Sequence, residues 1–123
     1  MAKAARALES AKILLDSNDL DGASNRAYYA VHDAAKAALL TTTSEDTAEP
    51  FRTHSGLIAA FGEHLVKTKR LPPTLGRMLN RAHEIRLIAD YKSEAIQTND
   101  AEELIEQATE FLTAIREFIA RAK

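Results

Sequence analysis

The chain has 123 residues, no cysteine and a formal net charge of -2 at pH 7. This length suits one domain with one core, so we expect a single domain over residues 1–123. Without cysteine, neither a disulfide framework nor a thiolate metal site can form. No apolar run approaches the roughly 20 residues that span a bilayer, and the first residues lack the apolar core of a signal peptide. We therefore expect a cytoplasmic protein without a membrane segment.

The first predicted helix covers Ala4 to Leu15. Its apolar stripe consists of Ala4, Leu8, Ala11, Leu14 and Leu15. The Ser-Asn-Asp run at 17–19 ends this helix and offers a cap to the next one, from Asp19 or Asp21.

The second predicted helix is the central one, and it runs to about Leu40. At about 100° per residue, one of its sides is almost entirely alanine: Ala23, Ala27, Ala30, Val31, Ala34 and Ala38. Alanine favours a helix and lets a second backbone come close. The opposite side carries Asn25, Tyr29, His32 and Lys36, with Arg26 and Asp33 at its edge. We interpret that side as a polar, aromatic face that meets another part of the molecule or a ligand.

Three more helices are predicted after a loop at residues 41–52. Thr53 caps a helix of about 15 residues whose inner face is Leu57, Ile58, Phe61 and Leu65. The next helix runs from about Pro73 to Tyr91, because proline fits well at a helix start. The last helix is capped by Asn99, with Glu102 three residues on, and continues to about Ala122.

No segment alternates with period two over a useful length, so no strand is predicted. The sequence therefore predicts an all-α fold, an antiparallel up-and-down bundle of about five helices. Four helices enclose the core, and the short third helix covers one end.

Two motifs resemble those of a known family. Arg26-Ala27-Tyr28-Tyr29-Ala30 is similar to the second helix of HEPN domains, and Arg86-x-x-x-Asp90-Tyr91 resembles a later motif of the same family. The resemblance implies a HEPN-like helical bundle that often forms a homodimer and needs no cofactor. It also implies a toxin–antitoxin pair with a minimal nucleotidyltransferase, since many HEPN domains are encoded beside one. Many catalytic members are metal-independent ribonucleases with arginine, four to six residues, then histidine.

This chain departs from that pattern. Counted from Arg86, the histidine position falls on Tyr91, Lys92 or Ser93, and none of these moves protons near neutral pH as histidine does. Arg77 and His83 match the spacing formally, but Arg77 lies about 180° around the helix from Arg86.

The fourth helix places His83, Arg86 and Asp90 on one stripe beside its apolar face. In the structural interpretation, Arg86 and Asp90 form an ion pair that lets the helix pack. In the functional interpretation, the stripe and the central helix line a groove for an anionic ligand. The catalytic candidates are then Arg86, Asp90, Tyr91 and His83. The ligand-binding candidates are Asn25, Arg26, Tyr29, His32 and Arg86.

Other signals are less specific. Residues 67–86 contain six lysines and arginines but a single carboxylate, that of Glu84. Such a basic patch could contact a phosphate backbone, although it is more often a solvated surface. The histidines lack metal-ligand spacing, so we expect no metal site and interpret His54 and His64 as surface or capping residues.

Three functions stay open. The first is a HEPN interaction module paired with a nucleotidyltransferase, which the sequence favours. The second is an atypical metal-independent ribonuclease toxin in which Arg86 stabilises the scissile phosphate. The third is a helical bundle that binds RNA, a nucleotide or another polyanion.

Overall fold

The computed structural model describes residues 1–42, 53–91 and 97–122, and it describes side chains for 1–42, 53–88 and 97–122. The helices in this part are α1 (Ala2–Asp16), α2 (Leu20–Leu40), α3 (His54–Phe61), α4 (Pro73–Tyr91) and α5 (Thr98–Ala122). A π-helical segment, η3 (Gly62–Val66), continues α3. The described residues contain no strand, which confirms the predicted all-α bundle.

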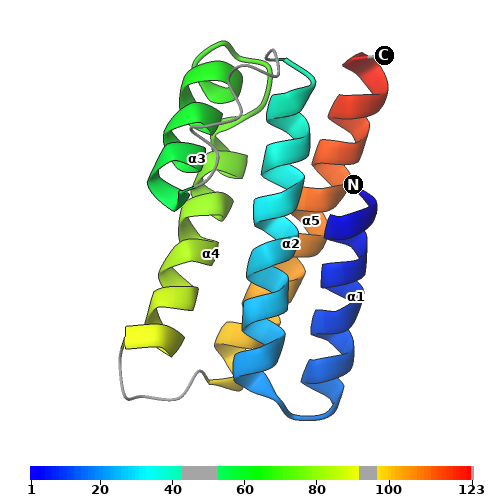
Figure 1. Cartoon of the computed structure of the whole chain (residues 1–123), viewed down its shortest axis with the longest axis vertical. Helices are drawn as coiled ribbons and strands as arrows, with labels where there is room; N and C mark the ends of the chain where they lie inside the picture. Colours follow the sequence, from blue (N-terminus) through cyan, green and yellow to red (C-terminus); the bar gives the residue numbers. More distant parts are fainter. Residues whose placement is uncertain (43–52, 92–96, 123) are drawn as a thin grey trace.

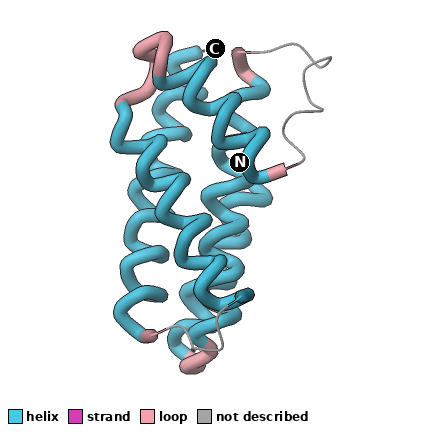
Figure 2. The backbone as a smooth tube through the Cα atoms, turned by 90° about the vertical axis from the view of Figure 1, so that its left-hand side faces the viewer, coloured by secondary structure: helices cyan, strands magenta, loops and turns pink. Residues whose placement is uncertain are grey.

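Helix α2 is the centre of the bundle. In Figure 1 it lies between α1 and α4 with α5 behind it, and it packs against all three. Helices α1 and α4 run downwards in this view, whereas α2, α3 and α5 run upwards. Figure 2 shows from the side that the helices follow the long axis of the molecule. The short α3 lies against the upper part of α4 and also packs on α2.

Local signals set several helix ends as predicted. The Asp19 carboxylate accepts a hydrogen bond from the Gly22 N–H at 2.9 Å and caps α2. The Thr53 hydroxyl accepts one from the Gly56 N–H at 3.0 Å and caps α3. Between α1 and α2, Asn18 has a φ of 64°, a left-handed conformation that asparagine tolerates and that stops a helix.

Two predictions about helix ends are wrong. Asn99 does not cap α5, because α5 begins at Thr98 and its first backbone bonds go to the Gln97 carbonyl. The predicted third helix is not a continuous α-helix either. The Lys67 N–H donates to the Gly62 carbonyl at 2.8 Å, the wider bond of a π-turn, and the segment ends at Val66.

The alanine face of α2 is packed as predicted. Its alanines at 23, 27, 30, 34 and 38 have no exposed surface, and Val31 is 1% exposed. Helix α5 supplies much of the large apolar volume through Leu104, Phe111, Leu112 and Ile115. None of the described helices combines the length and hydropathy that a membrane span needs.

Candidate functional site

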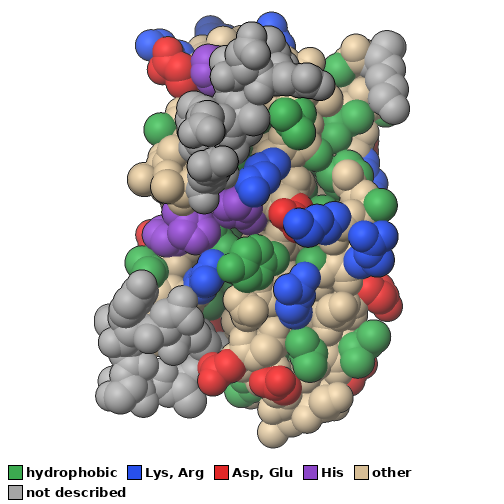
Figure 3. Space-filling model, viewed as in Figure 1, with side chains coloured by type: hydrophobic (Ala, Val, Ile, Leu, Met, Phe, Trp, Pro, Cys, Tyr) green, Lys and Arg blue, Asp and Glu red, His purple; other side chains and the backbone are tan. Residues whose placement is uncertain are grey.

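A cavity of about 370 Å³ opens on the polar side of α2, between this helix, the start of α3 and the middle of α4. Its wall includes cations, aromatic rings and two histidines: Lys3, Arg26, Tyr29, His32, Asp33, Lys36, His54 and Arg86. Figure 3 shows the face of the molecule on which histidine, lysine and arginine side chains gather. We call this cavity the polar cavity.

The charge of the polar cavity is strongly positive. Among the described residues, Lys3, Arg26, Lys36 and Arg86 line it, together with the carboxylate of Asp33. The whole chain has a net charge of -2, so this positive charge is a local feature. Anions are therefore the ligands that this wall favours.

Arg86 lies against aromatic rings at the base of the cavity. Its guanidinium carbon is 4.8 Å from the Tyr28 ring centroid and 5.0 Å from that of Tyr29. Both distances are within the range of a cation–π contact. Its Nη1 atom is also 3.4 Å from Nε2 of His54. Two consecutive tyrosines of α2 and the first residue of α3 thus fix where this arginine of α4 lies.

His54 is surrounded by the aromatic residues of α2 and α4. The Tyr28 hydroxyl contacts both ring nitrogens of His54, Nδ1 and, at 2.6 Å, Nε2, and Tyr28 itself is only 1% exposed. The His54 ring centroid is 4.5 Å from that of His83 and 5.2 Å from that of His32. Partial burial, His83 and Arg86 lower the pKa of the His54 imidazole below its usual value.

His32 is the most enclosed of these histidines. It is 6% exposed, and its Nδ1 atom has no hydrogen-bond partner among the described residues. Burial, followed by the Lys36 ammonium, lowers the pKa of the His32 imidazole to about 4. The ring is therefore neutral around pH 7. Among the described residues, no group of three His, Cys, Asp or Glu side chains could hold a metal ion.

The structure brings together four of the five predicted ligand-binding residues, since Arg26, Tyr29, His32 and Arg86 all line the polar cavity. The fifth, Asn25, is exposed and lies outside its wall. Arg77, the partner of His83 in the formal motif, is also exposed and outside it.

Among the catalytic candidates, Arg86 is in the wall of the cavity, and His83 is not part of the wall but lies behind His54. The side chains of Asp90 and Tyr91 lie outside the described residues, so the Arg86–Asp90 ion pair stays a prediction.

Sequence reasoning missed His54 as a site residue. It was interpreted as a surface or capping residue, whereas it is half-buried and in contact with Tyr28 and Arg86. The Thr53 cap was the available signal, because it fixes His54 as the first residue of α3. The sequence could not show which helix that first turn would face.

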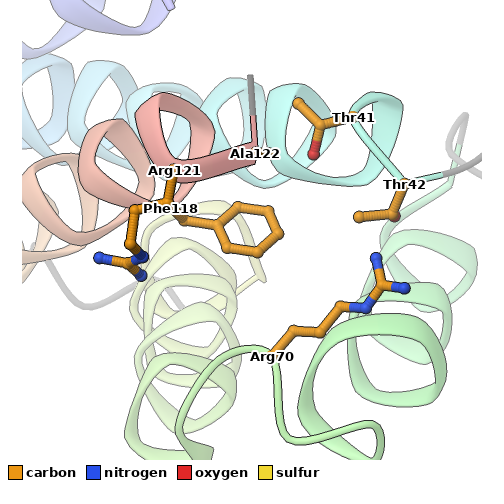
Figure 4. Close-up of a pocket in the computed structure, with 6 residues that line it drawn as sticks. All are labelled: Thr41, Thr42, Arg70, Phe118, Arg121 and Ala122. Atoms are coloured by element: carbon orange, nitrogen blue, oxygen red, sulfur yellow. The ribbon is translucent and has the colours of Figure 1, made fainter.

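A second cavity of about 420 Å³ lies where α2 and α5 end, beside Arg70. Its wall consists of Thr41, Thr42, Arg70, Phe118, Arg121 and Ala122. Figure 4 shows the Phe118 ring between the two arginine side chains. Among the described residues, the wall of this cavity has arginines but no histidine, lysine or carboxylate, and so no group that exchanges protons near neutral pH.

The basic residues at 67–86 do not form one surface. Arg86 belongs to the polar cavity and Arg70 to the second one. The Arg81 Nε–H donates to Glu103 of α5 at 2.9 Å, so the acidic last helix partly neutralises this group.

Residues 1–118 match the model of a protein family described as "HEPN domain". The chain belongs to the HEPN domain family. The Arg-Ala-Tyr-Tyr-Ala motif of this HEPN chain supplies Tyr28 and Tyr29, which hold Arg86 of the later motif, so the two motifs meet at the polar cavity.

Named relatives cover nearly the whole HEPN chain. "UPF0332 protein glr0978" of Gloeobacter violaceus is 34% identical over 98% of this chain and 94% of its own length. A UPF0332 protein of Thermotoga maritima is also 34% identical, over 98% and 89%. "Putative toxin MJ0605" of Methanocaldococcus jannaschii is 32% identical over 89% of this chain and 78% of its own. No solved structure matches the chain.

Proposed function

We propose that this HEPN chain is the toxin-like member of a toxin–antitoxin-like pair and that it binds and cleaves RNA in the polar cavity. The observation that carries the proposal is the position of Arg86, beside imidazole groups in a cavity whose described lining holds four cations and the carboxylate of Asp33. Two relatives from Methanocaldococcus jannaschii with 30–32% identity carry the name "Putative toxin", which supports the same class of function.

A phosphodiester suits this wall for two reasons. Arginine donates two parallel hydrogen bonds to phosphate oxygens, and Lys3, Arg26 and Lys36 can neutralise neighbouring phosphates of a strand. The half-buried Tyr29 ring lies in the same wall, and single-stranded RNA is commonly held by stacking its bases on such rings. Neutral histidines next to the phosphate would supply proton transfer without a metal ion.

The second candidate is a non-catalytic module that regulates, or is regulated by, a nucleotidyltransferase. It is favoured by the sequence after Arg86, which has no histidine at positions 91–93, where the family pattern would place it. In either case we expect a homodimer or a complex with the partner chain. Co-expression with the protein encoded beside this chain tests the pairing: the partner should copurify with it and relieve growth inhibition.

RNA binding is the direct test. Fluorescence anisotropy with a labelled single-stranded RNA should show saturable binding that weakens as salt rises. Arg86→Ala should weaken binding at least about tenfold, because a hydrogen-bonded charged contact contributes about 1.5–3 kcal/mol. The matched control is Arg77→Ala, an exposed arginine on the same helix outside the cavity, which should change the affinity less than about twofold.

Cleavage and toxicity complete the test. Induced expression of the wild-type chain should inhibit bacterial growth, and Arg86→Ala should not. Two results would contradict the proposal: no RNA binding by the wild-type chain at low salt, or equal effects of Arg86→Ala and Arg77→Ala. RNA binding without cleavage would favour the second candidate.

A further inference from the structure

Three histidines from three different helices lie within reach of the Arg86 region, although α4 has no histidine at the position that the family pattern requires. His32 comes from α2, His54 from α3 and His83 from α4. Their rings surround the Tyr28 ring, with centroid distances of 5.7, 4.8 and 6.4 Å respectively. The fold thus brings imidazoles to the arginine by a route that the sequence motif does not show.

Only one of these histidines has both access to the cavity and contact with Arg86. His83 is not part of the cavity wall, and its Nδ1 atom is buried and has no partner in the described part of the chain. His32 is part of the wall but is 6% exposed, and no hydrogen bond joins it to Arg86 among the contacts described. His54 lines the wall, is half-buried, and places Nε2 3.4 Å from Nη1 of Arg86.

We propose that His54 is the proton acceptor of the RNA cleavage reaction and that Tyr28 is the positioning residue that orients its ring. This inference rests on the proposed function, because it names the residue that performs its chemistry. It moves the acid–base group from α4, where the family pattern has it, to the first turn of α3.

The reaction balances with the groups in the cavity. A nitrogen of His54 takes the proton of the ribose 2′-hydroxyl, and the 2′-oxygen forms a bond to phosphorus. The bond between phosphorus and the 5′-oxygen breaks, and the leaving oxygen takes a proton from water. The products are a 2′,3′-cyclic phosphate and a 5′-hydroxyl end, and His54 then releases its proton to solvent. Arg86, beside His54, would stabilise the charge that develops on the phosphate oxygens.

The surroundings of His54 suit a proton acceptor. Arg86 can only donate hydrogen bonds, so its contact with Nε2 requires a neutral ring with a lone pair on that nitrogen. A bound phosphate would take the guanidinium in place of Nε2 and so free this lone pair to accept the proton. The lowered pKa of His54 has the same consequence, since the neutral form then dominates at pH 7. Tyr28 is 1% exposed, is not part of the cavity wall and contacts the ring nitrogens of His54, so it can fix the ring orientation without touching the substrate.

The test uses a DNA oligonucleotide with one ribonucleotide, so that cleavage can occur at one known bond. With EDTA present, the purified wild-type chain should produce the 2′,3′-cyclic phosphate and 5′-hydroxyl ends. His54→Gln should lower the cleavage rate about 10²–10⁴-fold, the usual contribution of a general base, while RNA affinity changes less than about threefold. His64→Gln is the matched control, because His64 is exposed and outside the cavity, and it should cleave normally.

The positioning role needs a separate readout. Tyr28→Phe keeps the buried ring and removes only the hydroxyl, so kcat should fall with little change in KM. The acid limb of its pH–rate profile should also move relative to that of the wild type. A Tyr28→Phe chain with unchanged kcat and an unchanged profile would overturn the role of Tyr28.

The outcomes separate this inference from the proposed function. If the wild type binds RNA in an Arg86-dependent manner and His54→Gln cleaves as fast as the wild type, the assignment of His54 is overturned and the function stands. Cleavage that stops with EDTA would also overturn it. If the wild type neither binds nor cleaves RNA, the proposed function fails and takes this inference with it. Circular dichroism of each variant shows whether the fold is kept.

Discussion

The two sides of α2 differ in how they are packed and in which side chains they carry. On one side, alanines at 23, 27, 30 and 34 are completely buried, and α1 adds small buried residues at 4, 7 and 11. On the other side, Tyr28, His32, His54 and Arg86 meet around a cavity of about 370 Å³. The first side is closely packed, and its described residues have no charged or titratable side chains, whereas the second borders a cavity and is rich in charged and titratable side chains.

The comparison teaches how a small bundle can hold an arginine and several histidines in place. Close packing at the alanine side fixes α2, because interiors packed with small residues leave little freedom to shift. Helix α2 then presents Tyr28 and Tyr29 at fixed positions, against which Arg86 and His54 lie. Stability is expected to come mainly from the first side and function from the second.

The largest effect is expected from a charge on the alanine side. Ala34→Glu would bury an unpaired carboxylate and should cost about 3–5 kcal/mol, enough to unfold much of a small domain. Ala37→Glu, on the partly exposed side of the same helix, is the control and should cost less than about 1 kcal/mol. Thermal unfolding followed by circular dichroism measures both. Similar melting temperatures for the two variants would contradict the packing role of this side.

The next largest effect is a pH dependence from His32. Well above pH 6.5 the ring is neutral in both the folded and the unfolded chain, so its protonation does not change the free energy of unfolding. As the pH falls from 6.5 to about 4, the unfolded chain gains a proton that the folded one excludes, and stability should drop by up to about 3 kcal/mol.

His32→Gln should remove most of that slope. Urea unfolding of both proteins at pH 4.5 and pH 7.5 measures it, and the His64→Gln chain should keep the wild-type slope. His54 contributes in the same direction, so the comparison between variants isolates the part due to His32. Parallel pH profiles for wild type and His32→Gln would show that His32 is not the cause.

A smaller effect on stability is expected from the Tyr28 hydroxyl. Tyr28→Phe retains the ring contacts with Arg86 and loses one buried hydrogen bond to His54, a change of about 1 kcal/mol. Denaturant unfolding at pH 7.5 measures it. A loss above about 3 kcal/mol would mean that the hydroxyl holds the helices together rather than orienting one ring.

Much of the fold could be predicted because its signals are local. The Asp19 and Thr53 caps, Pro73 at the start of α4 and the alanine periodicity of α2 all act within a few residues, and all are confirmed. The Asn99 prediction failed because α5 begins one residue earlier, at Thr98, and its first backbone bonds go to the carbonyl of Gln97, which is not a usual cap-forming residue.

The site was only partly predictable because its contacts are long-range. Arg26, Tyr29 and His32 share one side of a single helix, which periodicity shows. His54 contacts Tyr28 across 26 positions of the sequence and Arg86 across 32. The periodicity of a single helix cannot predict a contact between residues that are so far apart in the sequence.

The smallest effect is expected at Arg81. This residue lies on the same helix as Arg86, but it belongs neither to the polar cavity nor to the contacts of the alanine side of α2, so it serves as a reference for both. Arg81 bonds to Glu103 at 2.9 Å and to Glu84 at 3.4 Å, and all three side chains are more than a third exposed. Such pairs contribute about 0.2–1 kcal/mol, and salt screens them. Arg81→Ala should therefore lower stability by about 0.5 kcal/mol in dilute buffer and by less in 1 M salt, as measured by urea unfolding.

The RNA affinity of Arg81→Ala should equal that of the wild type, in contrast to Arg86→Ala. If Arg81→Ala also lost RNA binding, the basic surface of α4 rather than the polar cavity would be the binding site.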